Sequence, residues 1–199
     1  MYMLICGERR FSKAGKSITV YDPATHKAIG NVPDASKEDV DAAIKYAFEG
    51  FEKWSRTLLF ERIDIIRKFA DLIENNYEVI AEIETREMGK PIMQSRSECR
   101  GAAETVREIS EHARTLNGEV LPISNLPSAE EDMLITVREP YGVVTAIVPI
   151  NYPISQCILK LVPALLMGNT VIVKPASEAP LAVIKLIELL YEAGLPKYA

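Results

Sequence analysis

The chain lacks long apolar runs and lacks an excess of basic residues. No window approaches the roughly 18 consecutive apolar residues that a membrane span needs, so we predict no membrane partner. The 23 Lys and Arg residues stand against 28 Asp and Glu residues, for a formal net charge of −5. Because phosphate binding needs a basic face, this balance argues against nucleic acid as a partner.

Cysteine is scarce. The three cysteines, Cys6, Cys99 and Cys157, have no CxxC spacing, which favours a reducing compartment and gives no sign of a metal site. We therefore predict a cytoplasmic protein with three small, mostly buried thiols. Cys157 lies in the middle of an expected helix with no His or Glu base beside it in sequence, so it is a poor candidate nucleophile.

The GxGxxG fingerprint of dinucleotide-binding loops is also missing. No glycine occurs between Gly142 and Gly168, which excludes an ordinary Rossmann pyrophosphate loop. What stands there instead is a strand over 143–148, a loop over 149–153, a helix over 154–167 and a strand over 170–173. The apolar runs are typical of strands buried in a parallel sheet. The fold class is therefore α/β, built on a βαβ unit.

The rest of the chain predicts an N-terminal helical layer. A near capping box at Ser36 and Asp39 begins a helix, and Gly89 followed by Pro91 ends another. We expect the apolar stripe of the first helix to lie in the core; its members are Val40, Ala43, Ile44, Ala47, Phe48, Phe51 and Trp54. Strands are expected at 3–5, 17–21 and 27–32, separated by turns at 7–10 and 22–25. The expected helices cover residues 37–54, 58–75, 77–88, 93–116 and 182–193.

Charges of alternating sign mark the helix over 93–116. We expect a solvated face there, formed by Arg96, Glu98, Arg100, Glu104, Arg107, Glu108, Glu111 and Arg114. After it, residues 119–123 and 133–138 predict two strands joined by a loop over 124–132. Two strands alone are marginal in water, so this pair is expected to rest on something else, such as another subunit.

Polar residues follow both strands of the βαβ unit, at the edge where parallel sheets bind ligands. Asn151 lies between Pro149 and Pro153, and Lys174, Ser177 and Glu178 follow the second strand. A rigid Asn amide suits a fixed donor to a developing oxyanion. An Asn in a Pro-rich loop is also a common turn or cap residue, and spacing alone leaves both interpretations open.

Several motifs together resemble the aldehyde dehydrogenase superfamily. They are REPYGVV (138–144), PINYP (149–153), PALLMGNTVIVKPAS (163–177) and EAGLP (192–196), with DPATHKAIGNVPDASKEDVDAA (22–43), FADLIENN (69–76) and EMGKPI (87–92) before them. The resemblance covers essentially the whole chain in the family's order. It implies a Rossmann-like cofactor-binding fold, with residues 1–116 as its N-terminal strands and helices, 117–138 as an oligomerisation β-arm and 139–199 as its first βαβα segment.

The resemblance also implies roles for individual residues. Asn151 matches an Asn whose amide holds the oxyanion of a thiohemiacetal, and Lys174 matches a lysine that bonds the adenosine ribose. Ser177 stands where many members have a Glu that would repel a 2′-phosphate, so NADP is expected to be tolerated alongside NAD. The implied cofactor-binding positions are Ile147, Val148, Pro149, Ile150, Asn151, Lys174, Ala176 and Ser177.

Family chains are more than twice as long, and their nucleophilic Cys, general-base Glu and catalytic domain have no counterpart in these 199 residues. The first hypothesis is thus the N-terminal half of an NAD(P)-dependent enzyme that oxidises a small aldehyde, inactive without its other half. The implied partners are further copies of the chain or a separate C-terminal half. A stand-alone, non-catalytic nucleotide-binding or assembly module is the alternative, and a reductase of acyl phosphates or acyl-CoA is a third reading that the motifs favour less.

Overall fold

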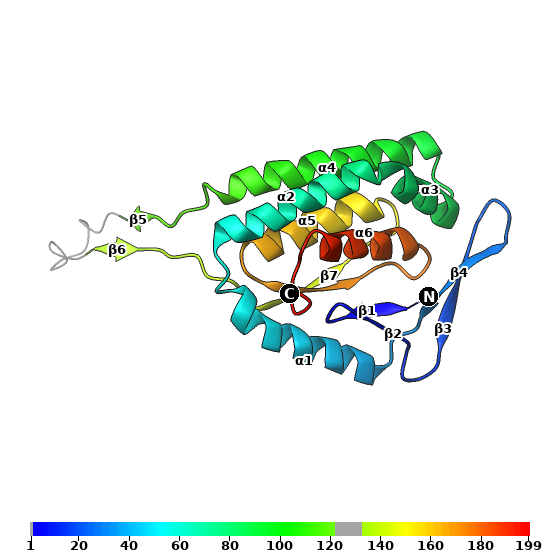
Figure 1. Ribbon diagram of the computed structural model, residues 1–199, viewed down its shortest axis with the longest axis horizontal. Coiled ribbons are helices and arrows are strands. Elements are labelled where there is room, and N and C mark those ends of the chain that lie inside the picture. The colour runs from blue at the N-terminus through cyan, green and yellow to red at the C-terminus, as the bar shows by residue number, and fades with distance from the viewer. Residues whose placement is uncertain (1, 122–132) are drawn as a thin grey trace.

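The protein has a helical body from which a thin two-stranded arm extends (Figure 1). The structure is a computed structural model that describes residues 2–121 and 133–199. The elements in chain order are β1 (Met3–Ile5), β2 (Glu8–Arg10), β3 (Ser17–Tyr21), β4 (Ala28–Pro33), α1 (Lys37–Trp54), α2 (Leu59–Asn75), α3 (Tyr77–Met88), α4 (Ile92–Ala113), β5 (Val120–Leu121), β6 (Leu134–Ile135), β7 (Val143–Ile147), α5 (Pro153–Leu166), β8 (Thr170–Lys174) and α6 (Leu181–Glu192).

The helical layer forms as its sequence signals predict. Ser36 and Asp39 make a complete capping box at the start of α1. Gly89 ends α3 with a φ of 76°, the left-handed conformation that glycine adopts without strain. Helices α2, α3 and α4 pack with α5 and α6 around one core, in which Phe69 and Ile80 are fully buried.

The βαβ unit is confirmed. Strands β7 and β8 are parallel, with Val143 opposite Thr170 and Ile147 opposite Lys174, and α5 crosses between them. Pro153 occupies the first turn of α5, where its missing N–H costs nothing. The fold class is therefore mixed α/β, with the helical layer and the first parallel strands of a sheet, as expected.

The shorter strands form three separate antiparallel pairs. Strand β3 pairs with β4, and β5 pairs with β6 in the arm through Val120–Ile135 and Leu121–Leu134. Residues Glu8–Arg10, expected to be part of a turn, instead form β2 and pair with β1. Cys6 and Gly7, both with positive φ, make the turn alone. The expected loop over 124–132 and the end of the first arm strand lie outside the described residues.

The prediction that the whole apolar stripe of α1 lies in the core is wrong. Val40, Ile44 and Phe48 are 46%, 39% and 59% exposed, whereas Ala47 and Trp54 are buried. The helix meets the body along the line of Ala47, Gly50 and Trp54, where Thr170 donates a hydrogen bond to the Ala47 carbonyl and Trp54 donates one to Leu165. The neighbouring line at 40, 44 and 48 therefore remains outside the contact.

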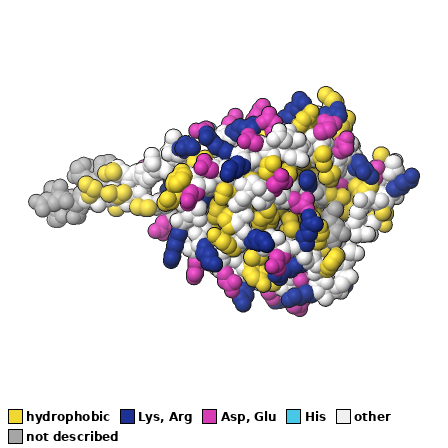
Figure 2. All heavy atoms as spheres, in the orientation of Figure 1, with side chains coloured by type: hydrophobic (Ala, Val, Ile, Leu, Met, Phe, Trp, Pro, Cys, Tyr) yellow, Lys and Arg dark blue, Asp and Glu magenta, His cyan; other side chains and the backbone are white. Residues whose placement is uncertain are grey.

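The surface carries charges of both signs. Figure 2 shows acidic and basic side chains interspersed over one face, with hydrophobic side chains along the arm and between the charges of the body. Within residues 2–121 and 133–199, none of the helices is both long enough and apolar enough to cross a bilayer.

Candidate functional site

The carboxyl ends of β7 and β8 bring two loops side by side. Ile147 and Lys174 are partners across the parallel pair, and the Val148 N–H donates to the Lys174 carbonyl at 3.0 Å. Residues 149–152 leave β7, and residues 175–180 leave β8. The loop that carries Asn151 and the segment that carries Lys174 therefore lie at the same edge of the sheet, which is where ligands bind in parallel α/β folds.

The first loop presents Asn151 to solvent. Asn151 and Pro149 are exposed, Ile150 is 41% exposed and Ile147 is 62% exposed. Val148 differs from these, because its side chain is buried in the core. Of the first-loop positions implied for cofactor binding, Val148 can thus contribute only its backbone.

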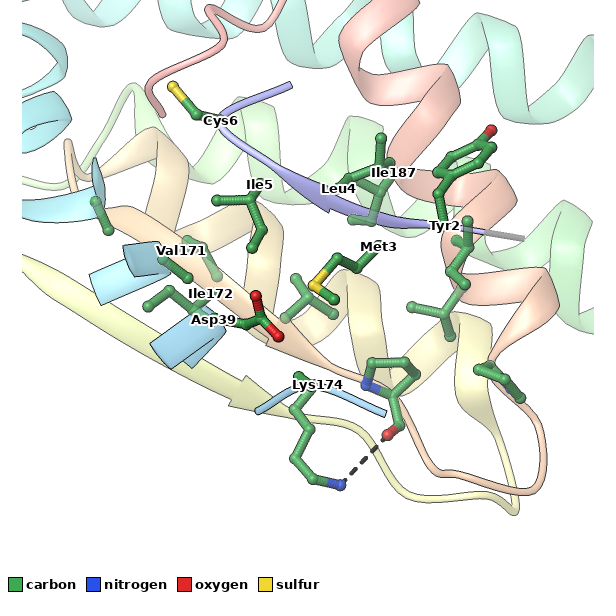
Figure 3. Close-up of a pocket in the computed structure, with 18 of the residues that line it drawn as sticks. Tyr2, Met3, Leu4, Ile5, Cys6, Asp39, Val171, Ile172, Lys174 and Ile187 are labelled. Atoms are coloured by element: carbon green, nitrogen blue, oxygen red, sulfur yellow. Dashed lines mark hydrogen bonds between the residues drawn. The ribbon is translucent and has the colours of Figure 1, made fainter. Parts of the chain in front are cut away.

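The second loop presents a cation and a hydroxyl. Lys174 is exposed, and within residues 2–121 and 133–199 its ammonium reaches only the Pro175 carbonyl, at a long 3.4 Å (Figure 3). Ser177 is exposed and Ala176 is partly buried. A lysine ammonium with so little engagement among the described residues can donate to hydroxyl or phosphate oxygens of a ligand.

A cavity of about 440 Å³ adjoins this loop. In Figure 3, Met3 and Ile5 of β1 face Val171 and Ile172 of β8 across it, and Lys174 lies at its margin. Consecutive residues of β8 line the cavity, as expected beside a strand edge rather than a strand face. Among the described residues β8 pairs with β7 alone, so its other hydrogen-bonding edge is open to this cavity.

Two buried carboxylates lie behind the loops, and the sequence interpretation missed both. Glu98, expected on a solvated face, is only 7% exposed and accepts the Ser155 N–H at the start of α5, at 2.9 Å. Glu87 of α3 accepts the Leu181 and Ala182 N–H groups at the start of α6, at 2.6 and 2.9 Å. The burial of Glu98 could have been inferred from its spacing of four residues from Ala102, because residues four apart lie on the same face of a helix and Ala102 is buried.

Burial sets the electrostatics of this region. Loss of solvation raises the pKa of Glu87 to about 7, although the Leu181 and Ala182 N–H groups oppose that rise. Burial likewise raises the pKa of Glu84, opposed by the Lys90 ammonium 2.6 Å away.

Two of the three cysteines, Cys99 and Cys157, do not supply a nucleophile here, whereas Cys6 is partly exposed and lines the cavity. Cys99 and Cys157 are fully buried, and burial raises the pKa of each thiol to about 12. Both thiols are therefore neutral near pH 7, which makes them unreactive. Within the described residues no group of three or more His, Cys, Asp or Glu is placed to hold a metal ion.

A helical layer, a parallel βαβ unit and polar loops at its carboxyl edge define an α/β class of fold in which ligands bind at that edge. Residues 11–199 match the family model described as "Aldehyde dehydrogenase family". The chain belongs to the aldehyde dehydrogenase family.

Individual relatives match the sequence of this chain over nearly its whole length. It is 35% identical over 197 residues to the D-glyceraldehyde dehydrogenase (NADP(+)) of Picrophilus torridus, covering 99% of this chain and 39% of that one. It is 38% identical over 182 residues to the 3-sulfolactaldehyde dehydrogenase of Priestia megaterium, covering 92% and 38%. The chain thus spans about two fifths of the length of the curated relatives it matches.

Solved structures share the fold. The NADP-dependent glyceraldehyde-3-phosphate dehydrogenase of Bacillus halodurans C-125, complexed with NADP, superposes with a TM-score of 0.94 at 36% identity, over 98% of this chain and 41% of that one. PnpE in complex with nicotinamide adenine dinucleotide gives 0.92 at 33% identity, over 99% and 40%.

Proposed function

We propose that this chain forms the adenosine side of the NAD(P) site of an aldehyde dehydrogenase. The observation that carries this proposal is the register pair Ile147–Lys174, which places both ligand loops at one sheet edge. The exposed Lys174 ammonium donates to the ribose hydroxyls. The relatives named above whose descriptions give a cofactor take NADP or NAD, which supports a dinucleotide here.

The second loop accepts either dinucleotide. Ser177 is neutral and exposed, so it brings no carboxylate to repel a 2′-phosphate. Lys174, three residues earlier, adds positive charge at the same edge. We propose that NADP binds at least as well as NAD for these two reasons.

Asn151 supplies the chemistry that this chain contributes to aldehyde oxidation. Its amide donates to the oxygen of the substrate carbonyl as negative charge develops there, and the flanking Pro149 and Pro153 restrict the loop that holds it. When bound, NAD(P) supplies the hydride acceptor.

The thiol that attacks the aldehyde comes from elsewhere in the proposed enzyme. Cys99 and Cys157 are buried and neutral, and the longer relatives contain sequence that this chain does not cover. Oxidation of a small aldehyde to a carboxylic acid then depends on that further sequence, as part of the same polypeptide or as a partner.

A chimera tests this assignment. The matching N-terminal part of the Picrophilus torridus relative is replaced by this chain, and aldehyde-dependent NADPH formation is measured. We expect activity, and we expect Asn151→Ala to lower kcat by roughly 100-fold or more, with exposed Asn31→Ala of β4 as the unaffected control. A folded chimera that binds NADP but has no activity would favour the alternative, a nucleotide-binding or assembly module without catalysis.

A further inference from the structure

The two helices that follow the ligand loops have no N-terminal cap of their own. The cap positions are Tyr152 before α5 and Pro180 before α6, and neither side chain accepts a backbone N–H. The first N–H groups of a helix have no partner within it and need acceptors from outside. Both helix starts are therefore incomplete as local structures.

Two carboxylates from the helical layer complete them. Glu98 of α4 accepts the Ser155 N–H across 57 positions in sequence, and Glu87 of α3 accepts two N–H groups of α6 across more than 90. Both side chains are almost fully removed from solvent. Each contact also places carboxyl oxygens at the positive end of a helix dipole.

Lys90 ties the first of these contacts to the loop itself. Its ammonium pairs with Glu98 and, at 2.6 Å, with Glu84, and it lies 4.2 Å from the centre of the Tyr152 ring. Tyr152 directly follows Asn151. The Lys90 side chain is 6% exposed, so these attractions act largely out of water, where they are stronger.

We propose that Glu98 and Glu87 are positioning residues, each fixing one ligand loop through the helix start behind it. Glu98, held by Lys90, sets the segment 149–152 that presents Asn151. Glu87 sets the segment 175–180 that follows Lys174. This inference rests on the proposed function for the meaning of the two loops, but the contacts themselves do not depend on it.

The first test measures amide hydrogen exchange in variants of the ligand-free chain. Glu98→Met keeps the volume and removes the acceptor, and we expect exchange in 149–155 to accelerate roughly tenfold or more while 175–182 is unchanged. For Glu87→Met we expect faster exchange in 175–182 and unchanged exchange in 149–155. Glu98→Gln and Glu87→Gln keep one acceptor oxygen each, so we expect partial rescue that is confined to the same segments.

Glu78→Met is the matched control. Glu78 of α3 pairs with Arg96 of α4 at 3.0 Å, at a half-exposed site without contact to either loop, so neither segment should change. If a Met variant does not fold, its Gln counterpart carries the test, since the loosening is still expected in one segment only. Wild-type exchange in both segments of folded variants, or acceleration spread evenly over the chain, overturns the proposal.

A second measurement separates this inference from the proposed function. Titration with 5′-AMP probes the adenosine side alone, and we expect Glu87→Met to weaken binding roughly tenfold and Glu98→Met to leave it unchanged. If the wild-type chain does not bind 5′-AMP, the proposed function fails while the exchange result still decides the positioning roles. Equal weakening by both variants overturns the separate assignment of each carboxylate to one loop.

Discussion

Lys90 and Glu84 form an ion pair inside the protein. The ammonium lies 2.6 Å from the carboxylate, and the two side chains are 6% and 0% exposed. One oxygen of Glu84 is buried without any hydrogen-bond partner in the described structure. Because Lys90 also pairs with Glu98, a single cation offsets two buried carboxylates.

Removing this cation is expected to destabilise the fold strongly. Lys90→Met leaves Glu84 and Glu98 buried without their cation, a change that costs about 3–5 kcal/mol in comparable sites. The free energy of unfolding from urea titration measures it. Lys37→Met, which breaks the exposed pair with Asp41, serves as control and should cost less than about 1 kcal/mol. Equal losses in the two variants would contradict the account.

Stability is expected to fall as the pH rises from about 4.5 to about 7. In that window the folded chain keeps a proton on Glu87, whose pKa is about 7, while the unfolded chain, with a value near 4.5, has released it. Each unit of difference in pKa corresponds to about 1.4 kcal/mol in the free energy of unfolding, so Glu87 alone accounts for a fall of up to about 3 kcal/mol across this window. Urea titrations at several pH values measure this slope.

Variants of single glutamates identify which residue causes this fall in stability. Glu87→Gln should reduce the fall between pH 4.5 and 7 and leave the part that comes from Glu84, whose pKa burial also raises. Glu78→Gln should leave the fall intact, because pairing with Arg96 lowers the pKa of Glu78 and moves its contribution below pH 4.5. A wild-type chain whose stability is constant or rises through this window would refute the assignment.

A carboxylate at position 177 is expected to select against NADP. Ser177→Glu should weaken NADP binding by roughly tenfold or more relative to NAD, because a negative charge would face the 2′-phosphate. Ser177→Ala is the matched control, since it changes the hydroxyl without adding charge. Parallel calorimetric titrations with both dinucleotides measure the ratio, and an unchanged ratio in Ser177→Glu would place the 2′-phosphate elsewhere.

The arm is expected to mediate self-association. Val120 and Ile135 pair across β5 and β6 and are 69% and 54% exposed, on a two-stranded unit that is marginal alone. We propose that a second copy of the chain covers them. Light scattering should then show an oligomer, and Val120→Lys with Ile135→Lys should shift it towards the monomer; Lys45→Glu on α1 is a control away from the arm. A monomeric wild-type chain would contradict this.

Local signals explain how much of the fold could be predicted. The limits of α3 follow from Asn76 and Gly89, and β7 and β8 follow from apolar runs that need no partner to be recognised. The exposure of Val40 and Phe48 could not be predicted, because periodicity defines an apolar face but not which line of it meets the body.

The candidate site could likewise be predicted only in part. Asn151 and Lys174 follow recognisable strands, so their proximity is a consequence of parallel pairing. Glu87 and Glu98 contact N–H groups that are far away in sequence, and the alternating charges of α4 concealed the burial of Glu98. Contacts of that range depend on how helices pack, which local patterns do not specify.

The central claim is that NAD(P) binds at the carboxyl edge of β7 and β8 through Lys174. Titration of the isotope-labelled chain with NADP, followed by NMR of the backbone amides, tests it most directly, with Lys174→Ala and the exposed Lys45→Ala as a matched pair. We predict shifts concentrated at residues 147–151 and 174–178, and affinity roughly tenfold lower in Lys174→Ala alone. Shifts elsewhere, equal affinities in the two variants, or no binding at millimolar NADP would contradict the claim.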